Sequence, residues 1–136
     1  GMRHSTDIVT GVMNEYKNRN SIVTNALLSL DSIAPEIIET LELRAWKRFA
    51  ELLNTVREQQ LKLHPDLVDI RNQKLINELI SQGVNGVKLL GGGGAGACLL
   101  AFSPNNQLRD AIKSISKLNN IETFPVRCAE QGVHFQ

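Results

Sequence analysis

One stretch of the sequence decides the fold: Gly83-Val84-Asn85-Gly86-Val87-Lys88-Leu89-Leu90-Gly91-Gly92-Gly93-Gly94-Ala95-Gly96-Ala97. A short apolar run is followed there by five glycines in six positions. Glycine loses more backbone entropy on folding than any other residue, at a cost of roughly 0.5–1 kcal/mol against alanine in regular structure. So many glycines together need a reason, either positive backbone φ angles or a close approach of the backbone to a neighbouring loop or a phosphate.

Two phosphate-binding patterns can be compared with this stretch. The Walker pattern ends in Gly-Lys-Ser/Thr, whereas Ala97-Cys98 follows the glycines here. The dinucleotide fingerprint needs a helix after the glycines, so that a phosphate meets the helix N-terminus. The segment that follows is short, apolar and closed by Ser103-Pro104, which favours a strand. Spacing alone therefore favours a tight connection between two strands over direct phosphate binding.

The residues before this stretch are predicted to be helical almost throughout. Ser5 and Ser21 are placed to cap two helices, and Pro35 is expected to interrupt the second. A bend is expected near Leu43, and residues 64–66 break the chain before a further helix that ends at Gly83. The predicted buried stripe of the first helix consists of Ile8, Val9, Val12, Met13 and Tyr16.

The residues after the glycines add one helix and further strands. Apolar spacing from Leu108 to Leu118 predicts the helix, and alternation from Phe124 to Cys128 predicts a strand that turns at Gly132 into residues 133–135. Residues 1–136 are thus expected to form one α+β domain. Its helices would pack on one side of a mostly antiparallel, roughly four-stranded, ferredoxin-like sheet.

Charge and composition argue against several classes of protein. Lys plus Arg number 15 against 14 Asp plus Glu, with few aromatic residues, so we expect no nucleic-acid partner and no anionic membrane surface. No apolar run approaches the roughly 20 residues of a spanning helix, and no signal peptide is seen. Cys98 and Cys128 are predicted to be reduced core thiols of a cytoplasmic protein. His4, His64 and His134 fit no ligand spacing, so no metal site is predicted.

The stretch from Gly83 to Ala97 resembles the third conserved motif of the GHMP kinases, a superfamily that includes galactokinase, mevalonate kinase, homoserine kinase and the fucose and heptose-phosphate kinases. The family pattern is Gly-x-x-Gly-x-Lys-x-x-Gly-Ala-Gly-Gly-Gly-Gly, followed by Cys or Phe. The chain departs from it at Gly92, Ala95 and Ala97, and the methyl group of Ala95 can forbid what the family glycine provides. The resemblance covers nearly the whole chain, but only the C-terminal domain of the family.

The resemblance implies a set of site residues. Those that would support the phosphate loop of another domain and line the active site are Lys88, Gly91, Gly92, Gly93, Gly94, Ala95 and Gly96. Lys88 can reach a phosphate or be a solvated strand residue. Arg3, His4 and Ser5 resemble the Arg-x-Ser of sugar-type members and would lie near the substrate, although Ser5 is equally a helix cap. No catalytic residue is assigned to this chain.

The nucleotide-binding half of the family is not found in this sequence. Family members bind nucleotide phosphates with a Pro-x-x-x-Gly-Leu-Gly-Ser-Ser loop in an N-terminal domain, which also carries the catalytic acid and the magnesium ligands. The chain is therefore identified as the C-terminal domain of an ATP-dependent sugar or sugar-phosphate kinase, truncated and inactive alone. ATP and Mg would belong to the whole enzyme, and a separate N-terminal half is one expected partner.

Two further expectations follow. The chain can instead be a standalone binding or assembly module that kept the fold and lost the chemistry, which Ala95 and the tag-like Gly1 before Met2 favour. In the family a strand ends just before the residues that match Arg3. Its loss would leave unpaired backbone groups on the sheet, and such edges invite pairing with a second copy. A homodimer is therefore predicted.

Overall fold

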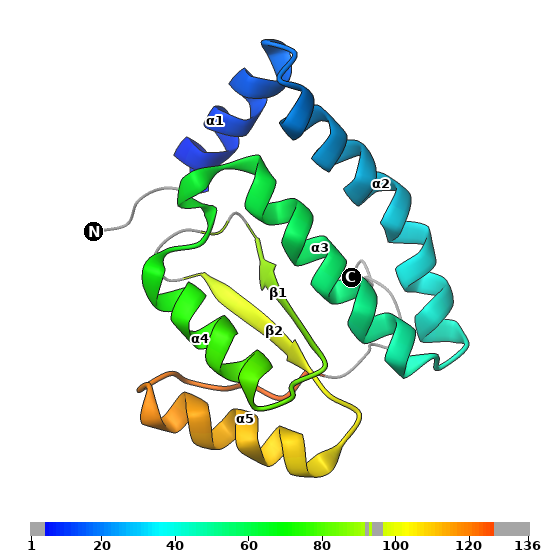
Figure 1. The fold of residues 1–136 in the computed structure, drawn as a ribbon, viewed down its shortest axis with the longest axis vertical. Coiled ribbons are helices and arrows are strands. Elements are labelled where there is room, and N and C mark those ends of the chain that lie inside the picture. The colour runs from blue at the N-terminus through cyan, green and yellow to red at the C-terminus, as the bar shows by residue number, and fades with distance from the viewer. Residues whose placement is uncertain (1–4, 92, 94–96, 127–136) are drawn as a thin grey trace, which may run out of the picture.

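The computed structural model describes residues 5–91, 93 and 97–126. Helices dominate this part of the chain, and a two-stranded antiparallel sheet lies among them (Figure 1). The elements in chain order are α1 (Ser5–Lys17), α2 (Ser21–Glu42), α3 (Trp46–Leu63), the 3₁₀ helix η1 (Pro65–Leu67), α4 (Ile70–Ser81), β1 (Gly86–Leu90), β2 (Cys98–Phe102) and α5 (Asn106–Leu118).

Helix α2 differs from the sequence prediction at its start and in its middle. Its cap is Asn20, whose Oδ1 accepts the backbone N–H of Ile22 at 3.0 Å and of Val23 at 3.3 Å, so the predicted Ser21 cap is wrong. The helix also runs through Pro35 without a break. Pro35 and Asp31 are both exposed, so the carbonyl group that the proline ring leaves unbonded faces water.

Helices α2 and α3 form an antiparallel pair. The predicted bend near Leu43 is a full break, where Arg44 adopts a left-handed φ of 52° before α3 begins. Buried Ile33 packs against Leu52 and Val56 between the two helices. At the end of the pair, Arg48 Nε donates to Glu36 Oε1 at 2.7 Å.

The sheet has two strands within the described residues, where roughly four were expected. β1 and β2 pair antiparallel, with Lys88 opposite Leu100. The strand predicted from Phe124 to Cys128 is wrong as far as it is described: residues 121–126 form no strand, and Phe124 and Val126 are 72% and 74% exposed. Among the residues that the structure describes they have no neighbouring strand to hydrogen-bond, and alternation alone does not create one. Cys128 and the predicted turn at Gly132 lie outside the described residues.

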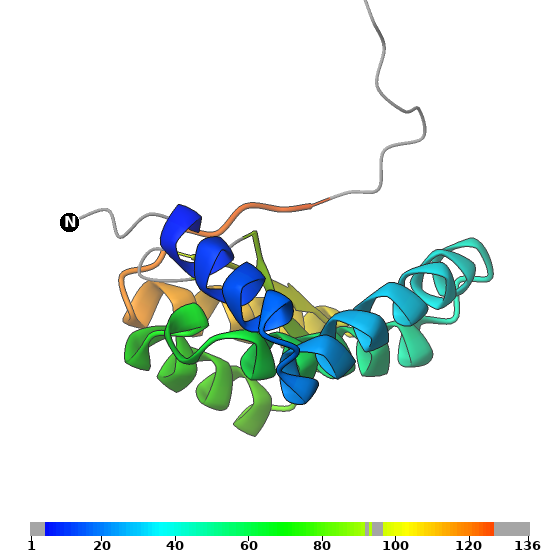
Figure 2. The same ribbon diagram turned by 90° about the horizontal axis from the view of Figure 1, so that it is seen from above.

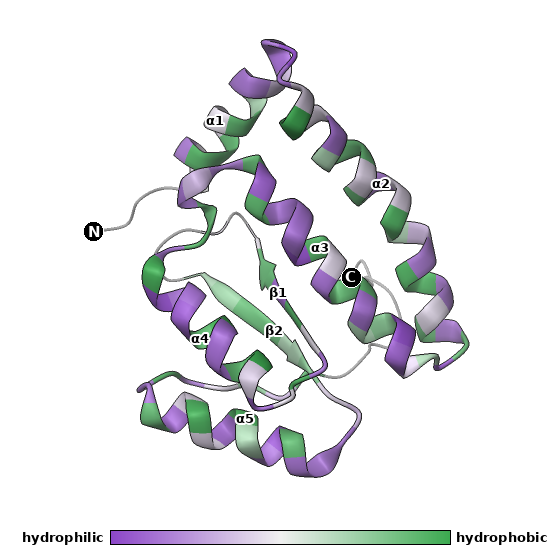
Figure 3. Ribbon diagram, in the orientation of Figure 1, coloured by the Kyte–Doolittle hydropathy of each residue, from purple (hydrophilic) through white to green (hydrophobic). Residues whose placement is uncertain are grey.

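The two faces of the sheet differ in burial. Val87 and Leu89 point to one face and are both 0% exposed, packed among the buried side chains of α1, α4 and α5. The opposite face carries half-buried Lys88 and exposed Leu90 and Cys98, and we call it the open face. Figure 2 places α4 and residues 121–126 on opposite sides of the sheet. Both strands are largely hydrophobic (Figure 3).

Two predictions of burial are wrong. Only Ile8 and Val12 of the α1 stripe are buried, and Val9, Met13 and Tyr16 are exposed because α1 packs along one narrow side. Cys98 is an exposed thiol on the open face, whereas a core thiol was predicted.

Helix α2 also bears on the membrane prediction. Within the described residues, it is long and apolar enough to cross a membrane by length and composition, and 17% of its apolar stretch is buried in the fold. Length and composition alone are weak evidence for a membrane-spanning helix, because helices in the cores of globular proteins can share both. Val23, Ala26 and Ile33 of α2 are buried within the fold.

Candidate functional site

The glycine-rich stretch forms the connection between β1 and β2. The spacing argument for a link between adjacent strands is confirmed, because β2 begins at Cys98 and pairs with β1. Gly91 and Gly93 are described. Gly92, Gly94, Ala95 and Gly96 lie outside the described residues, as do Arg3 and His4, and Ser5 is the first residue of α1.

Gly91 and Gly93 both adopt left-handed backbone angles, with φ of 68° and 72°. A side chain at Gly91 would enter open space. At Gly93 a Cβ would lie 2.8 Å from Leu67 Cγ and closer still to the Leu67 carbonyl oxygen. The connection therefore rests on η1, and Gly93 is required because no side chain fits between the two backbones.

The two glycines before the apolar run also have structural reasons. Gly83 follows α4 with φ of 85°, which confirms the predicted left-handed end of that helix. Gly86 begins β1 where α3 crosses closely: a Cβ there would lie 2.9 Å from the carbonyl oxygen of Ala50 and 3.0 Å from its Cα. All four described glycines of the stretch are thus explained by packing or by backbone angle.

The β1–β2 connection lies against η1, which is capped by His64. His64 Nδ1 accepts the backbone N–H of Asp66 at 3.1 Å, which fixes the start of η1. Leu67 ends η1 and is buried in the same cluster as Ile8 and Leu89. A short cap, a single 3₁₀ turn and the α1 core together hold the surface against which Gly93 lies.

Lys88 projects from the middle of β1 onto the open face. Its side chain is half-buried, and burial lowers the pKa of its amine below the ordinary value. No carboxylate forms a salt bridge with it in the part of the chain that the structure describes. Lys88 thus combines features of both readings of the sequence: it is a strand residue, and its cation is partly desolvated and available to an anion.

Sequence reasoning missed the side chains that hold β1. Asn54, Arg57 and Gln60 follow one another at three-residue spacing along α3 and hydrogen-bond the edge of β1 that faces away from β2. Asn54 Oδ1 accepts the N–H of Val87 at 3.1 Å, and Arg57 Nη1 donates to the carbonyl oxygen of Val87 at 2.9 Å. Gln60 Nε2 donates to the carbonyl oxygen of Leu89 at 3.2 Å.

This ladder takes the place of a third strand. Burial lowers the pKa of the Arg57 guanidinium, whose Nη1 also donates to Asn54 Oδ1 at 2.8 Å. The Oε1 atom of Gln60 is buried without a partner in the described residues. In the sequence these three are polar residues at every third position of an amphipathic helix, beside its buried apolar side chains.

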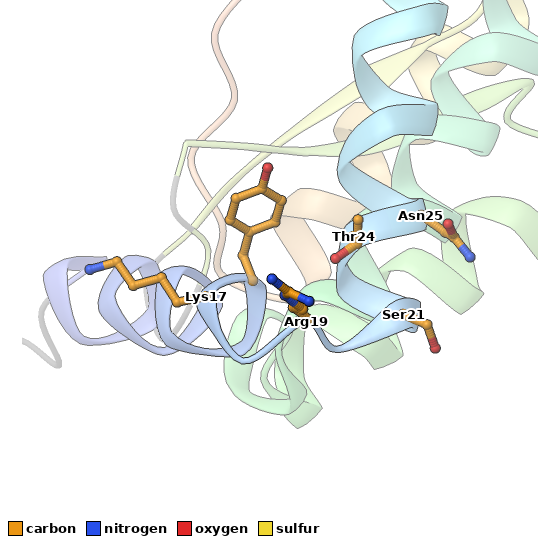
Figure 4. A pocket seen from close by; sticks show the side chains of 6 residues that line it. Lys17, Arg19, Ser21, Thr24 and Asn25 are labelled. Carbon is orange, nitrogen blue, oxygen red and sulfur yellow. The ribbon is translucent and has the colours of Figure 1, made fainter.

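Two other places where a functional site could lie offer fewer reactive or binding groups. An open hollow of about 500 Å³ lies at the turn between α1 and α2, away from the β1–β2 connection (Figure 4). The side chains of Lys17, Arg19 and Ser21 spread apart around it. Among residues 5–91, 93 and 97–126 no three His, Cys, Asp or Glu side chains gather as metal ligands.

Comparison with known proteins gives a likeness of fold. The chain matches no protein-family model and no curated protein. Its structure is similar to that of L. major mevalonate kinase, solved in complex with R-mevalonate, with a TM-score of 0.73 and 19% identity. The match covers 85% of this chain and 34% of that enzyme, so the chain spans about a third of its length. At this level of identity the match shows a likeness of fold.

Proposed function

We propose that the chain is the C-terminal part of an ATP-dependent small-molecule kinase of the GHMP type. In this role the β1–β2 connection braces the phosphate loop of a nucleotide-binding half, and Lys88 contributes a cation at the open face. Phosphoryl transfer depends mainly on positioning and on charge stabilisation, so a domain without the phosphate loop, the catalytic acid and the magnesium ligands is inactive alone. A sugar or sugar phosphate is the proposed acceptor.

The main support is the agreement between the glycine stretch and the fold. The pattern from Gly83 to Ala97 falls on a strand, a braced connection and a second strand. That arrangement belongs to a structure whose fold is similar to that of a mevalonate kinase. Neither observation names the acceptor, and mevalonate belongs among the candidates to be assayed beside galactose, fucose and heptose phosphates.

Two measurements test the proposal. The purified chain with Mg·ATP and the acceptor panel is expected to transfer no phosphate, and measured transfer would contradict the proposed division of labour. The reading frame upstream of Met2 should encode a Gly-Leu-Gly-Ser-Ser segment. When that segment's polypeptide is co-expressed with this chain, the complex should bind an ATP analogue, and Lys88→Met should weaken that binding while Lys74→Met on exposed α4 should not.

The second candidate function is a standalone binding module with the kinase fold and no catalysis. It is favoured by the explanation found for Gly83, Gly86, Gly91 and Gly93, each of which serves the fold without a phosphate. Ala95 points the same way, because the family pattern has glycine there. An unrelated gene upstream, together with no nucleotide binding by any co-expressed neighbour, would select this function.

A further inference from the structure

A glycine in the middle of α1 marks a close contact between this helix and His64. Gly11 is a helix-interior residue beside buried Ile8 and Val12, and glycine is a poor helix former at such a position. A Cβ at position 11 would lie 2.8 Å from both Cδ2 and Nε2 of the His64 ring. Helix α1 therefore carries a glycine at the point where the imidazole ring packs against it.

The same ring also holds the start of η1. His64 Nδ1 accepts the backbone N–H of Asp66 at 3.1 Å, and the backbone N–H of Leu67 donates to the carbonyl oxygen of His64 at 3.2 Å. A neutral imidazole has one N–H and one acceptor nitrogen, so an accepting Nδ1 assigns the ring proton to Nε2. In the imidazolium both nitrogens are donors. The side-chain cap of η1 thus requires a neutral ring.

The capped turn in turn supports the glycine-rich connection. Leu67 ends η1, is 5% exposed and packs in one cluster with Ile8 and Leu89. Gly93 lies directly against Leu67, because a Cβ at position 93 would clash with the Leu67 carbonyl oxygen and Cγ. The imidazole ring, η1 and the connection therefore contact one another in series, and a change at the ring reaches Gly93 through one short turn.

The charges around the ring do not favour an imidazolium in its present place. The charged residues nearest to this contact along α1, α3 and η1 are Asp7, Glu15, Lys62, Asp66 and Asp69. Among the residues that the structure describes, no carboxylate forms an ion pair with the imidazole. Nδ1 faces a backbone donor instead, so a proton on Nδ1 would set two donors against each other.

We propose that His64 is a pH-sensitive latch for the β1–β2 connection. Histidine changes its charge between about pH 5 and pH 8. When the ring gains its second proton, Nδ1 can no longer accept the N–H of Asp66, and the imidazolium leaves its place against Gly11. The start of η1 is then no longer fixed, and Leu67 no longer holds Gly93. The connection is held near neutral pH and released on acidification. This inference does not depend on the proposed kinase function.

A titration of the full chain by nuclear magnetic resonance tests the latch. From pH 8 to pH 5, the amide resonances of Asp66, Leu67 and Gly93 should move together with the ring resonances of His64. The ring nitrogen shifts at pH 8 should place the proton on Nε2. Exchange of the Asp66 amide, corrected for the intrinsic effect of pH, should be about tenfold faster at pH 5 than at pH 8. A proton on Nδ1 at pH 8, or a Gly93 amide that does not respond, overturns the proposal.

The matched control is His64→Asn. The side-chain oxygen of asparagine also caps a helix start, and it does not titrate. The corrected exchange of the Asp66 amide in this variant should stay within about twofold between pH 8 and pH 5. The variant keeps His4, His134 and every carboxylate, so an equal acid response in the variant and the parent chain would assign the effect to those groups and overturn the latch.

Gly11→Ala tests the same contact from the side of α1, and it serves also where His64→Asn does not fold. The added methyl group must displace the imidazole ring, so exchange of the Asp66 amide should be about tenfold faster than in the parent chain already at pH 8. Circular dichroism should show that the helices are kept, because alanine is the better helix former. Unchanged protection of the Asp66 amide at pH 8 would show that the ring does not hold η1, and the proposal would be wrong.

Discussion

The two described glycines of the β1–β2 connection differ in what lies where a side chain would be. Gly93 lies against the backbone of Leu67, whereas Gly91 faces open space. Gly91→Ala should therefore cost only the left-handed angle, roughly 1–2 kcal/mol of unfolding free energy. Gly93→Ala should cost that amount and a further roughly 1–3 kcal/mol for the clash with η1. Urea unfolding of the two variants beside the parent chain measures the difference.

Equal destabilisation by the two substitutions would contradict the contact between the connection and η1. The sequence could predict that the glycines needed a reason, because five in six positions are costly. It could not predict which glycine was tied to Leu67. That contact joins residues far apart in the chain, and no local pattern encodes it.

Lys88 provides a prediction about pH. Burial lowers the pKa of its amine in the folded chain, so the folded state holds this proton less tightly than the unfolded state. The protonated amine thus destabilises the fold near neutral pH, and stability rises as the pH passes through the lowered pKa. Lys88→Met should raise the Tm at neutral pH, and the gap to the parent chain should narrow as the pH rises through the lowered pKa toward the ordinary lysine value of about 10.4.

Differential scanning fluorimetry across that pH range measures the effect, with exposed Lys74→Met as the control. A lower Tm for Lys88→Met at neutral pH would show that the amine makes a stabilising contact. From the sequence, two interpretations of Lys88 stayed open: a phosphate ligand or a solvated strand residue. The structure explains why: Lys88 lies on a strand, yet its side chain is half-buried on the open face.

At the scale of elements, α3 holds β1 through side chains. Asn54→Ala removes the acceptor for the N–H of Val87, which is 0% exposed, and the donor to the carbonyl oxygen of Asn85. An unsatisfied buried donor costs about 1–3 kcal/mol, so the unfolding free energy should fall by that amount. Thr55→Ala should change it by less than about 0.5 kcal/mol, because Thr55 bonds only the carbonyl oxygen of Glu51 in its own helix.

Chemical denaturation of both variants checks this prediction, and a similar loss in both would show that α3 stabilises β1 by packing alone. The Asn54 contacts were beyond sequence reasoning because they join residues on two separate elements. Helical periodicity did predict the helices, and the short apolar runs on either side of the glycines predicted the paired strands. The error at Ser21 arose because Asn20 is the better-placed cap, and the error at Pro35 arose because an exposed proline can remain inside a helix.

At the scale of the whole molecule, the sequence predicted the fold class better than the size of the sheet. A helix gains its hydrogen bonds from its own residues, so local spacing is enough to predict it. A strand needs a neighbour, and residues 121–126 have none among the described residues. The sequence predicted where in the chain the candidate site lies, namely at the glycine-rich stretch. In the proposed kinase, the role of that site would depend on a nucleotide-binding half.

The ladder of Asn54, Arg57 and Gln60 has a consequence for how the chain can aggregate. A sheet that is open at both edges can add copies without limit and grow into fibrils. Here the outer edge of β1 is blocked by α3, so no copy can add to the sheet on that side. Asn54→Ala combined with Arg57→Ala should free the blocked edge, and prolonged incubation should then give thioflavin-positive fibres where the parent chain gives none.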